Sequence, residues 1–561
     1  MNNKDRFILY NKDDEFDYKK NKSKIDIRFN RISFIFFVFF VISIIYSIHL
    51  VHLGTRKSDD SKKDQKNYLN NLKRADIIDR NGDFLAKTVS SIDIGINPTE
   101  IIDQKKLLLN LGYIFPNKNY ELIKSKINKN KFFWFEKKIS EDNYEKIMML
   151  GDKSIKPEEK LTRIYPQKNL FSHIIGQIDD DNNGISGLEK SLDERLKKNK
   201  NEISLTVDKD IQFLIREELI KFNNIFRTKG SAAILMDVKN GEILSLLSLP
   251  DFDPNARERI ENVNFINRAT KGVYELGSVF KTFTLAAGIH EGLIEPDTKF
   301  INLEKSIKCG KNIITEYDKN IPSNLTAEEI LIRSGNIGSV RIGQSVGIEK
   351  FKEFLEDLDL INTIQFDIQE MGVPLSFNWG KCKLATASYG HGITTTILQL
   401  ANAYSIIANG GYKINPTLVK KDNLNLNNER ILKNDVSKKI NSILRKIVTT
   451  KEGTASLANI EGYEVGGKTG TAQKSALGGY SNYKINTFAS VFPISDPKYT
   501  LVVMLDEPKT NSEYIYHYRD GTGIKYQGTP FNTAGWTTVE VVGQIIEKIG
   551  PILATKYNEI Y

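Results

Sequence analysis

The chain has 561 residues, which is more than one compact hydrophobic core normally holds, so we expect two or three domains. A hydrophobic content of 40% and a charged content of 27% are typical of a globular protein and not of a disordered one. The net charge of +9 comes from 79 basic and 70 acidic residues spread along the chain, which favours a mixed, solvated surface over a nucleic-acid-binding one. The six histidines and the two cysteines, Cys309 and Cys382, match no metal-ligand spacing, so we expect no metal or other cofactor. The two cysteines neither require nor exclude a disulfide.

The first element in chain order is an apolar segment long enough to cross a membrane. No formally charged residue occurs between Ile32 and Thr55, and a helix of about 20 such residues is about 30 Å long, the thickness of the hydrocarbon layer. A buried soluble helix rarely needs so long a run, and no small-residue cleavage pattern follows, as a signal peptide would require. We therefore predict a tail at 1–31, a transmembrane helix at 32–53 and a polar linker at 54–73. Lys and Arg are about equally frequent on the two sides, so charge alone does not orient the helix.

A first folded domain is predicted at 74–203. It opens with short runs of β-forming residues that alternate with turn signals such as Asn81-Gly82. The lysine-rich stretch at about 100–160 has a helical pattern. Residues 173–196 are expected to combine a strand, a turn-rich loop and a helix that begins near Gly187.

A second domain is predicted at 204–561, opening with a strand that leads into an amphipathic helix. Residues 231–250 form two apolar runs joined at Asn240-Gly241, a pair typical of a hairpin with a two-residue type I′ turn. Helical patterns then alternate with apolar strands such as 499–505. The fold class expected from this order is α+β, with helices packed on an antiparallel sheet.

Three short motifs occur in order in the second domain. They are Ser278-Val279-Phe280-Lys281, Ser334-Gly335-Asn336 and Lys468-Thr469-Gly470-Thr471. Taken singly, the first two are weak signals, because S-x-x-K recurs at Ser481–Lys484 and Ser495–Lys498, and S-x-N recurs at Ser376–Asn378. An isolated match is usually a surface coincidence or a turn, and a phosphate-binding loop is an alternative for the third motif that we do not favour. All three in this order are typical of serine acyl-transfer enzymes.

The first motif supplies a nucleophile and a base. A serine hydroxyl reacts poorly at neutral pH unless a base lies within hydrogen-bond distance. Ser278 and Lys281 are three residues apart, so they share one face of a helix. Burial near a second cation would lower the pKa of Lys281 and allow its neutral amine to accept the serine proton. The backbone N–H of Ser278, at a helix start, is free to bind an oxyanion.

The other two motifs supply the remaining groups of an acyl-transfer site. We expect Ser334 to relay the proton to the leaving amine and Asn336 to hold the substrate amide. Lys468 is expected to provide positive charge. The strand after it is expected to bind substrate: Gly470 admits a peptide backbone, Thr469 and Thr471 offer hydroxyls to a carboxylate, and the Thr471 N–H is the second oxyanion donor.

With these motifs in place, the chain resembles the class B penicillin-binding proteins, and most closely their septal cell-division transpeptidases. The resemblance extends from about residue 74 to 546. RADIIDRNGDFLAKT and HIIGQIDDDNNGISGLEKSLD resemble the opening and closing segments of the family's non-catalytic pedestal domain. NRATKGVYELGSVFK, the segment at 388–420, YEVGGKTGTAQK and the segment at 526–546 resemble parts of its transpeptidase domain.

The resemblance implies an elongated pedestal of the dimerisation type and a serine β-lactamase-like catalytic domain outside the bacterial inner membrane, with a cytoplasmic tail. It implies a D,D-transpeptidase that cross-links peptidoglycan stem peptides through a serine acyl-enzyme and that β-lactams inhibit. It also implies an FtsW-like glycan polymerase and other division proteins as partners, and no nucleic acid.

Three positions depart from the family pattern. Proline is usual where Leu276 stands, threonine where Val279 stands and serine where Gly335 stands. None of them removes a reacting group, but Val279 lacks a hydroxyl beside the nucleophile and Leu276 loosens a turn. The alternatives to a septal enzyme are an elongation-type transpeptidase of the same class, a division scaffold without catalysis and, less favoured, a β-lactamase.

Overall fold

The computed structural model describes residues 31–52, 73–199, 201–256, 263–310, 312–375, 377–421, 429–476 and 479–557. These residues belong to two units, Met1–Lys73 and Arg74–Tyr561. The tail predicted at 1–31, apart from Arg31, and the linker predicted at 54–73, apart from Lys73, lie outside the described residues.

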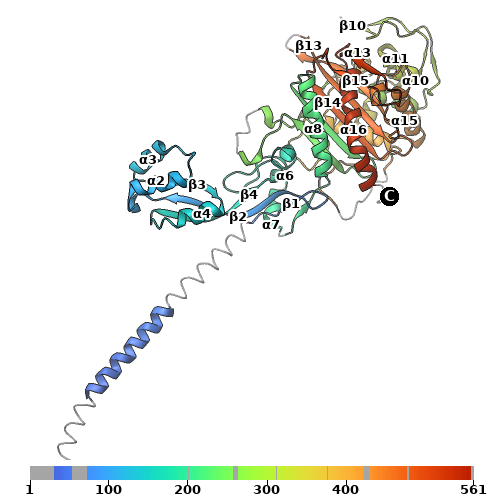
Figure 1. Cartoon of the computed structure of the whole chain (residues 1–561). Coiled ribbons are helices and arrows are strands. Elements are labelled where there is room, and N and C mark those ends of the chain that lie inside the picture. Colours follow the sequence, from blue (N-terminus) through green and yellow to red (C-terminus); the bar gives the residue numbers. More distant parts are fainter. Residues whose placement is uncertain are drawn as a thin grey trace, which may run out of the picture. The chain divides into compact units, whose positions relative to one another are not determined.

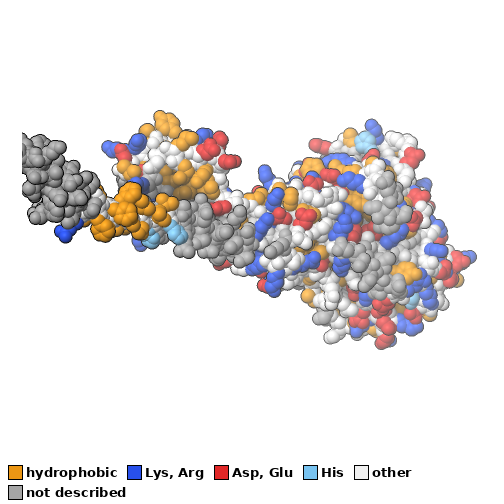
Figure 2. All heavy atoms as spheres, turned by 90° about the horizontal axis from the view of Figure 1, so that it is seen from below, with side chains coloured by type: hydrophobic (Ala, Val, Ile, Leu, Met, Phe, Trp, Pro, Cys, Tyr) orange, Lys and Arg blue, Asp and Glu red, His pale blue; other side chains and the backbone are white. Residues whose placement is uncertain are grey.

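The first unit contains one helix, Arg31–His52, among its described residues. It has 22 residues and a mean hydropathy of 2.6, and none of its apolar window is buried in protein. Its hydrophobic side chains form a continuous exposed band in Figure 2. An apolar helix of this length and exposure fits a membrane span, as the sequence predicts.

The second unit begins with a small mixed sheet in the order β3-β2-β1-β5, with β4 also paired to β2. The prediction of helix throughout 100–160 is wrong in part, because two of these strands lie there. The strand expected near residue 173 is instead the short helix α5 (Ser172–Ile175), whereas the helix expected near Gly187 is confirmed as α6. The elements are β1 (Ile77–Ile78), β2 (Phe84–Ile96), α2 (Gln104–Ile114), α3 (Tyr120–Asn128), β3 (Phe133–Ile139), α4 (Glu141–Met148), β4 (Ile155–Ile164), α6 (Gly187–Ser191), α7 (Asp193–Lys198) and β5 (Ile203–Ser204).

The rest of the second unit is built on a five-stranded sheet in the order β12-β13-β14-β6-β7, in which every neighbouring pair is antiparallel. This confirms the predicted sheet, including the strand at 499–505. The strands are β6 (Gly230–Asp237), β7 (Ile243–Leu249), β12 (Gly466–Ala476), β13 (Gly479–Phe492) and β14 (Tyr499–Asp506).

Helices cover both faces of this sheet (Figure 1). Every residue of β14 is buried, and β14 contacts both α16 and α14, so these two helices lie on opposite faces. Helix α8 packs with α16, while α15 and α9 pack with each other on the α14 side. The helices are α8 (Lys209–Ile225), α9 (Lys281–His290), α14 (Ile397–Ala408), α15 (Asn434–Thr449) and α16 (Thr538–Lys556).

The predicted hairpin at 231–250 is confirmed, but its turn is not the two-residue type I′ turn. The last hydrogen bond before the turn is donated by Asp237 N–H to Glu242 O, so the loop between these two residues has four residues. Within this fully described loop only Gly241 has a positive φ, 75°. Asn240 instead accepts the Glu242 N–H on its side chain, which favours the longer loop.

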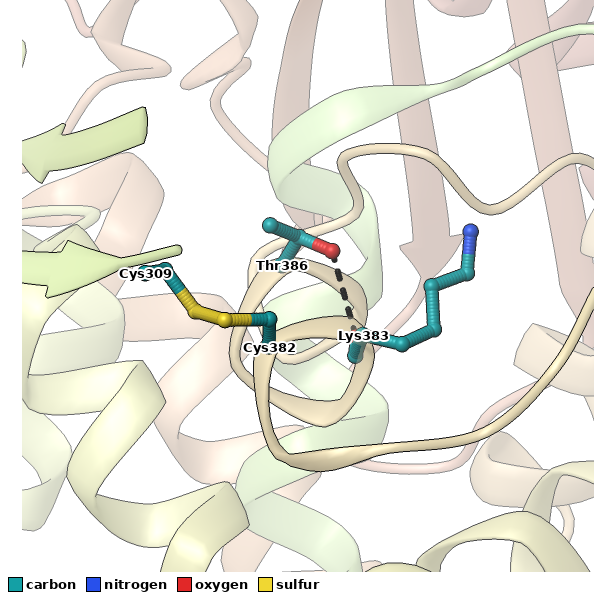
Figure 3. Close-up of a disulfide and its surroundings, with 4 residues drawn as sticks. All are labelled: Cys309, Cys382, Lys383 and Thr386. Carbon is teal, nitrogen blue, oxygen red and sulfur yellow. Dashed lines mark hydrogen bonds between the residues drawn. A yellow bond between two sulfur atoms is a disulfide. The ribbon is translucent and has the colours of Figure 1, made fainter. Parts of the chain in front are cut away.

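A second, smaller hairpin is separate from the main sheet and carries one of the cysteines. Strands β9 (Ser306–Cys309) and β10 (Asn312–Thr315) form it, and a disulfide joins Cys309 to Cys382 in the first turn of α13 (Lys381–Ala387), with the Cα atoms 5.3 Å apart. Figure 3 shows this bridge from strand to helix, with the Lys383 side chain pointing away from it. The sequence left the state of these cysteines open.

Candidate active site

Ser278 lies in a tight turn at the start of helix α9. The turn is the 3-10 segment η5 (Gly277–Phe280), and Ser278 is half-buried within it. Gly277 has a φ of 62°, and a Cβ on it would lie 2.8 Å from the Thr471 carbonyl oxygen. Glycine is therefore required here, because the turn needs a left-handed residue and the neighbouring strand lies directly against it.

Ser334 ends one helix and precedes the next. It follows α10 (Ala327–Ile332) with a φ of 59°, and Ser334 N–H and Gly335 N–H donate to the carbonyls of Leu331 and Ile330. This pair of bonds is a Schellman ending, in which glycine is the usual left-handed residue. The left-handed turn leads from α10 into α11 (Asn336–Val346), so the second motif spans the junction between the helices.

The third motif lies on β12, at the edge of the main sheet. Lys468 is fully buried, and a Cβ on Gly470 would lie 2.2 Å from the Leu276 carbonyl oxygen. The absence of a side chain at Gly470 thus lets β12 pack against the turn that bears Ser278. An edge strand also keeps one row of backbone groups available to a further strand.

Hydrogen bonds from two buried lysines, Lys281 and Lys468, join the three motifs. Lys281 Nζ donates to Ser334 Oγ (3.3 Å) and to Asn336 Oδ1 (2.7 Å), and it also contacts the Ser334 carbonyl. Lys468 Nζ donates to the same Ser334 Oγ (2.9 Å) and to Thr469 O (3.1 Å). The structure therefore brings Lys281, Ser334, Asn336 and Lys468 together, whereas Ser278 Oγ has no hydrogen bond to any of them within the described residues.

Burial sets the charge of the two lysines. It lowers the pKa of Lys281 to about 7, against an opposing effect of the Glu316 carboxylate. Burial also lowers the pKa of Lys468 well below its ordinary value, and the adjacent Lys281 lowers it further. The two amines bond to the same hydroxyl and are shielded from solvent, so a positive charge on one disfavours a positive charge on the other. At least one amine of the pair can therefore be neutral near pH 7.

The threonines of the third motif have distinct partners. Thr469 Oγ1 is hydrogen-bonded to Thr454 Oγ1 at 2.8 Å. Thr471 Oγ1 accepts the Ala534 N–H at 3.0 Å. A hydroxyl that accepts an N–H keeps its own proton to donate, so Thr471 is able to bind an anionic oxygen.

Among the described residues, the duplicate motif at Ser481–Lys484 does not form a second site of this kind. Ser481 Oγ donates to Lys474 O, and Lys484 Nζ donates to Asn532 O, so that serine and lysine have different partners. Ser495 N–H donates to the Glu464 carboxylate. Ser376 lies outside the described residues.

A phosphate-binding loop is excluded by the fold. The residues from Gly462 to Thr469 do fit the letters of the pattern G-x-x-x-x-G-K-[ST]. In a phosphate-binding loop, however, the lysine precedes a helix whose free N–H groups bind the phosphate. Lys468 instead lies inside strand β12, three residues into it.

Sequence reasoning missed Glu316, the residue that follows β10. Its carboxylate accepts the Asn336 N–H at 2.6 Å and the Ile337 N–H at 2.9 Å. Next to it, Thr315 O accepts the Asn336 Nδ2–H at 2.8 Å. No motif marks Glu316, because it lies 20 positions before the asparagine whose backbone it binds.

The departures at Leu276 and Val279 place apolar side chains in the core. Both are fully buried in the main hydrophobic cluster. A Cβ on Gly470 would lie 3.0 Å from the Val279 Cγ1 atom, so Val279 packs towards β12. Nothing in the structure explains why valine and leucine replace the usual residues.

Comparisons with known proteins agree with this arrangement. Residues 231–521 match the family model of the penicillin binding protein transpeptidase domain, and residues 70–221 match that of the penicillin-binding protein dimerisation domain. The probable peptidoglycan D,D-transpeptidase FtsI of Caulobacter vibrioides is 29% identical over 498 residues, which cover 86% of this chain and 82% of that protein. The peptidoglycan D,D-transpeptidase FtsI of Buchnera aphidicola is 29% identical, over 79% of this chain and 83% of that protein. The apo crystal structure of penicillin binding protein 3 from Mycobacterium tuberculosis has a similar fold, with a TM-score of 0.63 at 23% identity over 85% of this chain and 96% of that one.

Proposed function

The chain belongs to the penicillin-binding protein transpeptidase family, and from this premise we propose that it is a membrane-anchored septal peptidoglycan D,D-transpeptidase. The observation that carries the proposal is the hydrogen-bonded group of Lys281, Ser334 and Lys468, in which Lys281 directly follows the turn that bears Ser278. In this proposal Lys281 is the base, Ser334 is the proton relay and the lysine pair carries the positive charge, and all three act on the half-buried Ser278.

In the acylation step, the neutral amine of Lys281 accepts the Ser278 proton while Ser278 Oγ attacks the penultimate D-Ala carbonyl of the donor stem peptide. The oxyanion is bound by the backbone N–H groups of Ser278 and Thr471. As the peptide bond breaks, the proton passes through the Ser334 hydroxyl to the leaving amine of the terminal D-Ala. An acyl-enzyme and free D-Ala result.

In the second step, an amine of a neighbouring stem peptide attacks the acyl-enzyme carbonyl. The amine loses its proton to the lysine–serine relay, and Ser278 Oγ leaves with that proton. The product is a cross-link, and the enzyme is restored. A β-lactam mimics the donor and acylates the same serine.

Substrate alignment is assigned to strand β12 and to Asn336. A donor peptide adds to the free edge of β12, with Gly470 opposite its backbone. Thr469 and Thr471 donate their hydroxyls to the terminal carboxylate, while the Asn336 amide holds the substrate's peptide group. The Lys281–Lys468 pair contributes positive charge near that carboxylate whenever one of its two amines is protonated.

The helix Arg31–His52 is assigned as the anchor, with the tail at 1–31 in the cytoplasm and the catalytic domain in the periplasm. The disulfide Cys309–Cys382 supports this orientation, because disulfides persist in the periplasm and are rare in the cytosol. The partners proposed are an FtsW-like glycan polymerase and other division proteins, at the division septum.

Labelling with a fluorescent penicillin tests the chemistry. We expect one covalent adduct on the full chain, its loss in Ser278→Ala, and normal labelling of the matched control Ser481→Ala. Labelling that persists in Ser278→Ala would contradict the mechanism, and an unlabelled natural chain would favour the catalytically inactive scaffold.

A fluorescent fusion separates the septal from the elongation-type enzyme. We expect fluorescence at mid-cell during division. Fluorescence along the side wall would assign the chain to elongation, with the same chemistry.

A further inference from the structure

Helix α11 lacks a capping side chain of its own. The N-cap residue of α11 is Gly335, which has no side chain, and no side-chain hydrogen bond caps the helix from that position. The first N–H groups of a helix have no partner within the helix, and an anionic group beside them is favoured by the helix dipole. Glu316 fills this role from a distant segment, with one carboxylate oxygen on Asn336 N–H (2.6 Å) and the other on Ile337 N–H (2.9 Å).

The same segment also fixes the Asn336 side chain. Thr315 O accepts the Asn336 Nδ2–H at 2.8 Å, and Lys281 Nζ donates to Asn336 Oδ1 at 2.7 Å. The backbone and the amide of Asn336 are therefore both held by consecutive residues at the end of β10. Any movement of that strand end moves the amide that contacts Lys281.

The β9–β10 hairpin has little packing of its own. A two-stranded hairpin is only marginally stable in water, and the buried cluster beside this one consists of Ile314, Ile337, Val340 and Ala385. The Cys309–Cys382 disulfide ties the hairpin to α13 (Figure 3). Glu316 thus follows one end of the hairpin and binds α11, while the disulfide holds the opposite end of the hairpin to α13.

We propose that Glu316 is a positioning residue for acyl transfer, which acts by clamping the start of α11 so that Asn336 and Lys281 keep the geometry of the reactive state. This inference rests on the proposed transpeptidase function. Glu316 does not touch the substrate in this scheme, and its effect passes through Asn336 and Lys281.

The pH dependence distinguishes this role from simple stabilisation. Within the described chain, Glu316 is the charged group that shifts the pKa of Lys281, and Lys281 in turn lowers the pKa of Lys468. Glu316 raises the pKa of Lys281 against the lowering effect of burial. Loss of that carboxylate therefore lowers the pKa, and the acidic limb of the acylation rate, which reports deprotonation of the base, moves to lower pH.

The test compares acylation of the full chain by a fluorescent penicillin across pH for the natural protein, Glu316→Gln, Glu316→Asp and Glu304→Gln. Glu304 is the matched control, because its carboxylate also contacts α11, by pairing with Arg341. Unlike Glu316, it is half-exposed and does not bond to Asn336. In Glu316→Gln one N–H of α11 faces an amide NH₂ instead of an oxygen. We expect its plateau rate to fall by about tenfold or more, with the acidic limb shifted to lower pH, while Glu304→Gln stays within about twofold of the natural protein.

Glu316→Asp keeps the charge and is expected to recover part of the rate and an unshifted limb. Glu316→Gln with an unchanged rate, or with an unshifted limb, overturns the proposal. If Glu316→Gln fails to fold, Glu316→Asp decides: a lowered plateau with an unshifted limb supports the role, and an unchanged plateau overturns it. Failure of the natural chain to be acylated at Ser278 would instead overturn the proposed function itself.

Discussion

Ser334 has a backbone conformation that serine rarely adopts. Its φ of 59° lies in the left-handed region, which costs a residue with a Cβ about 1 kcal/mol or more. The same position brings its hydroxyl within 2.9 Å of Lys468 Nζ and 3.3 Å of Lys281 Nζ. The strained backbone conformation thus accompanies the position of the hydroxyl between the two amines. A glycine at this position would relieve the strain but would lose the hydroxyl.

Comparison of Ser334→Gly with Ser334→Ala isolates that strain, since both lose the hydroxyl. We expect Ser334→Gly to be the more stable of the two by about 1 kcal/mol, because only alanine keeps the left-handed penalty. Both should lose penicillin acylation by at least about 100-fold, as expected for removal of a proton relay. Denaturant unfolding and labelling kinetics measure the two effects. Equal stability of the variants would show that the turn relaxes without cost.

At the scale of elements, the β9–β10 hairpin depends on bonds that lie far apart in sequence. The disulfide closes a loop of 73 positions, from the hairpin to helix α13. A cross-link between distant residues stabilises a fold mainly by restricting the unfolded chain. Removal of the bridge is therefore expected to weaken the whole domain and, through Glu316, the geometry at Asn336.

The double variant Cys309→Ala/Cys382→Ala tests the bridge. We expect its free energy of unfolding to fall by about 2–4 kcal/mol, with slower but detectable penicillin labelling. Thermal unfolding with and without a reductant gives the readout. The reductant should lower the stability of the natural chain but not that of the variant, since the variant has no disulfide to reduce. Two reactive thiols in the unreduced, denatured natural chain would contradict the disulfide.

At the scale of the whole molecule, the unit from Arg74 to Tyr561 starts at a buried ion cluster. Arg74 and Arg163 donate to opposite oxygens of Glu189 at 2.9 Å and 2.7 Å, and all three side chains are at most 1% exposed. Arg74 also pairs with Asp193 at 2.6 Å. The cluster joins the first residue of the unit to strand β4 and helix α6, so it fixes the point at which the chain enters the fold.

Glu189→Gln removes the charge that the two arginines share. We expect a loss of about 3–5 kcal/mol of unfolding free energy, because the variant leaves buried cations without their full compensation. Glu194→Gln is the control, since Glu194 pairs with Lys198 at an exposed position, and it should leave stability essentially unchanged. Thermal unfolding of the full chain measures both. Equal losses of stability in the two variants would show that the charge of Glu189 contributes no more to the free energy of unfolding than an exposed ion pair does.

The parts of the fold that were predictable are those with a local signal. The helix Arg31–His52, the β6–β7 hairpin and β14 each follow from apolar runs and turn residues within the segment itself. The helical pattern expected at 100–160 is wrong at strand β4, because five consecutive residues of its ten are exposed and four of these are charged, so they show no apolar alternation. The type I′ turn was wrong because the Asn240 side chain caps a longer loop, a choice that the Asn-Gly pair does not reveal.

The sequence by itself determined the apolar helix, the antiparallel sheet and the three motifs with their candidate site residues, because each depends on side chains that are close together along the chain. Only the tertiary structure decided that Lys281 and Lys468 share one hydroxyl, that Cys309 meets Cys382 and that Glu316 caps the helix of Asn336. These are contacts between segments distant in sequence, and they form only when burial of the surrounding core brings the segments together. The lowered pKa values of the two lysines depend on that burial, so the chemistry of the site is a property of the folded chain.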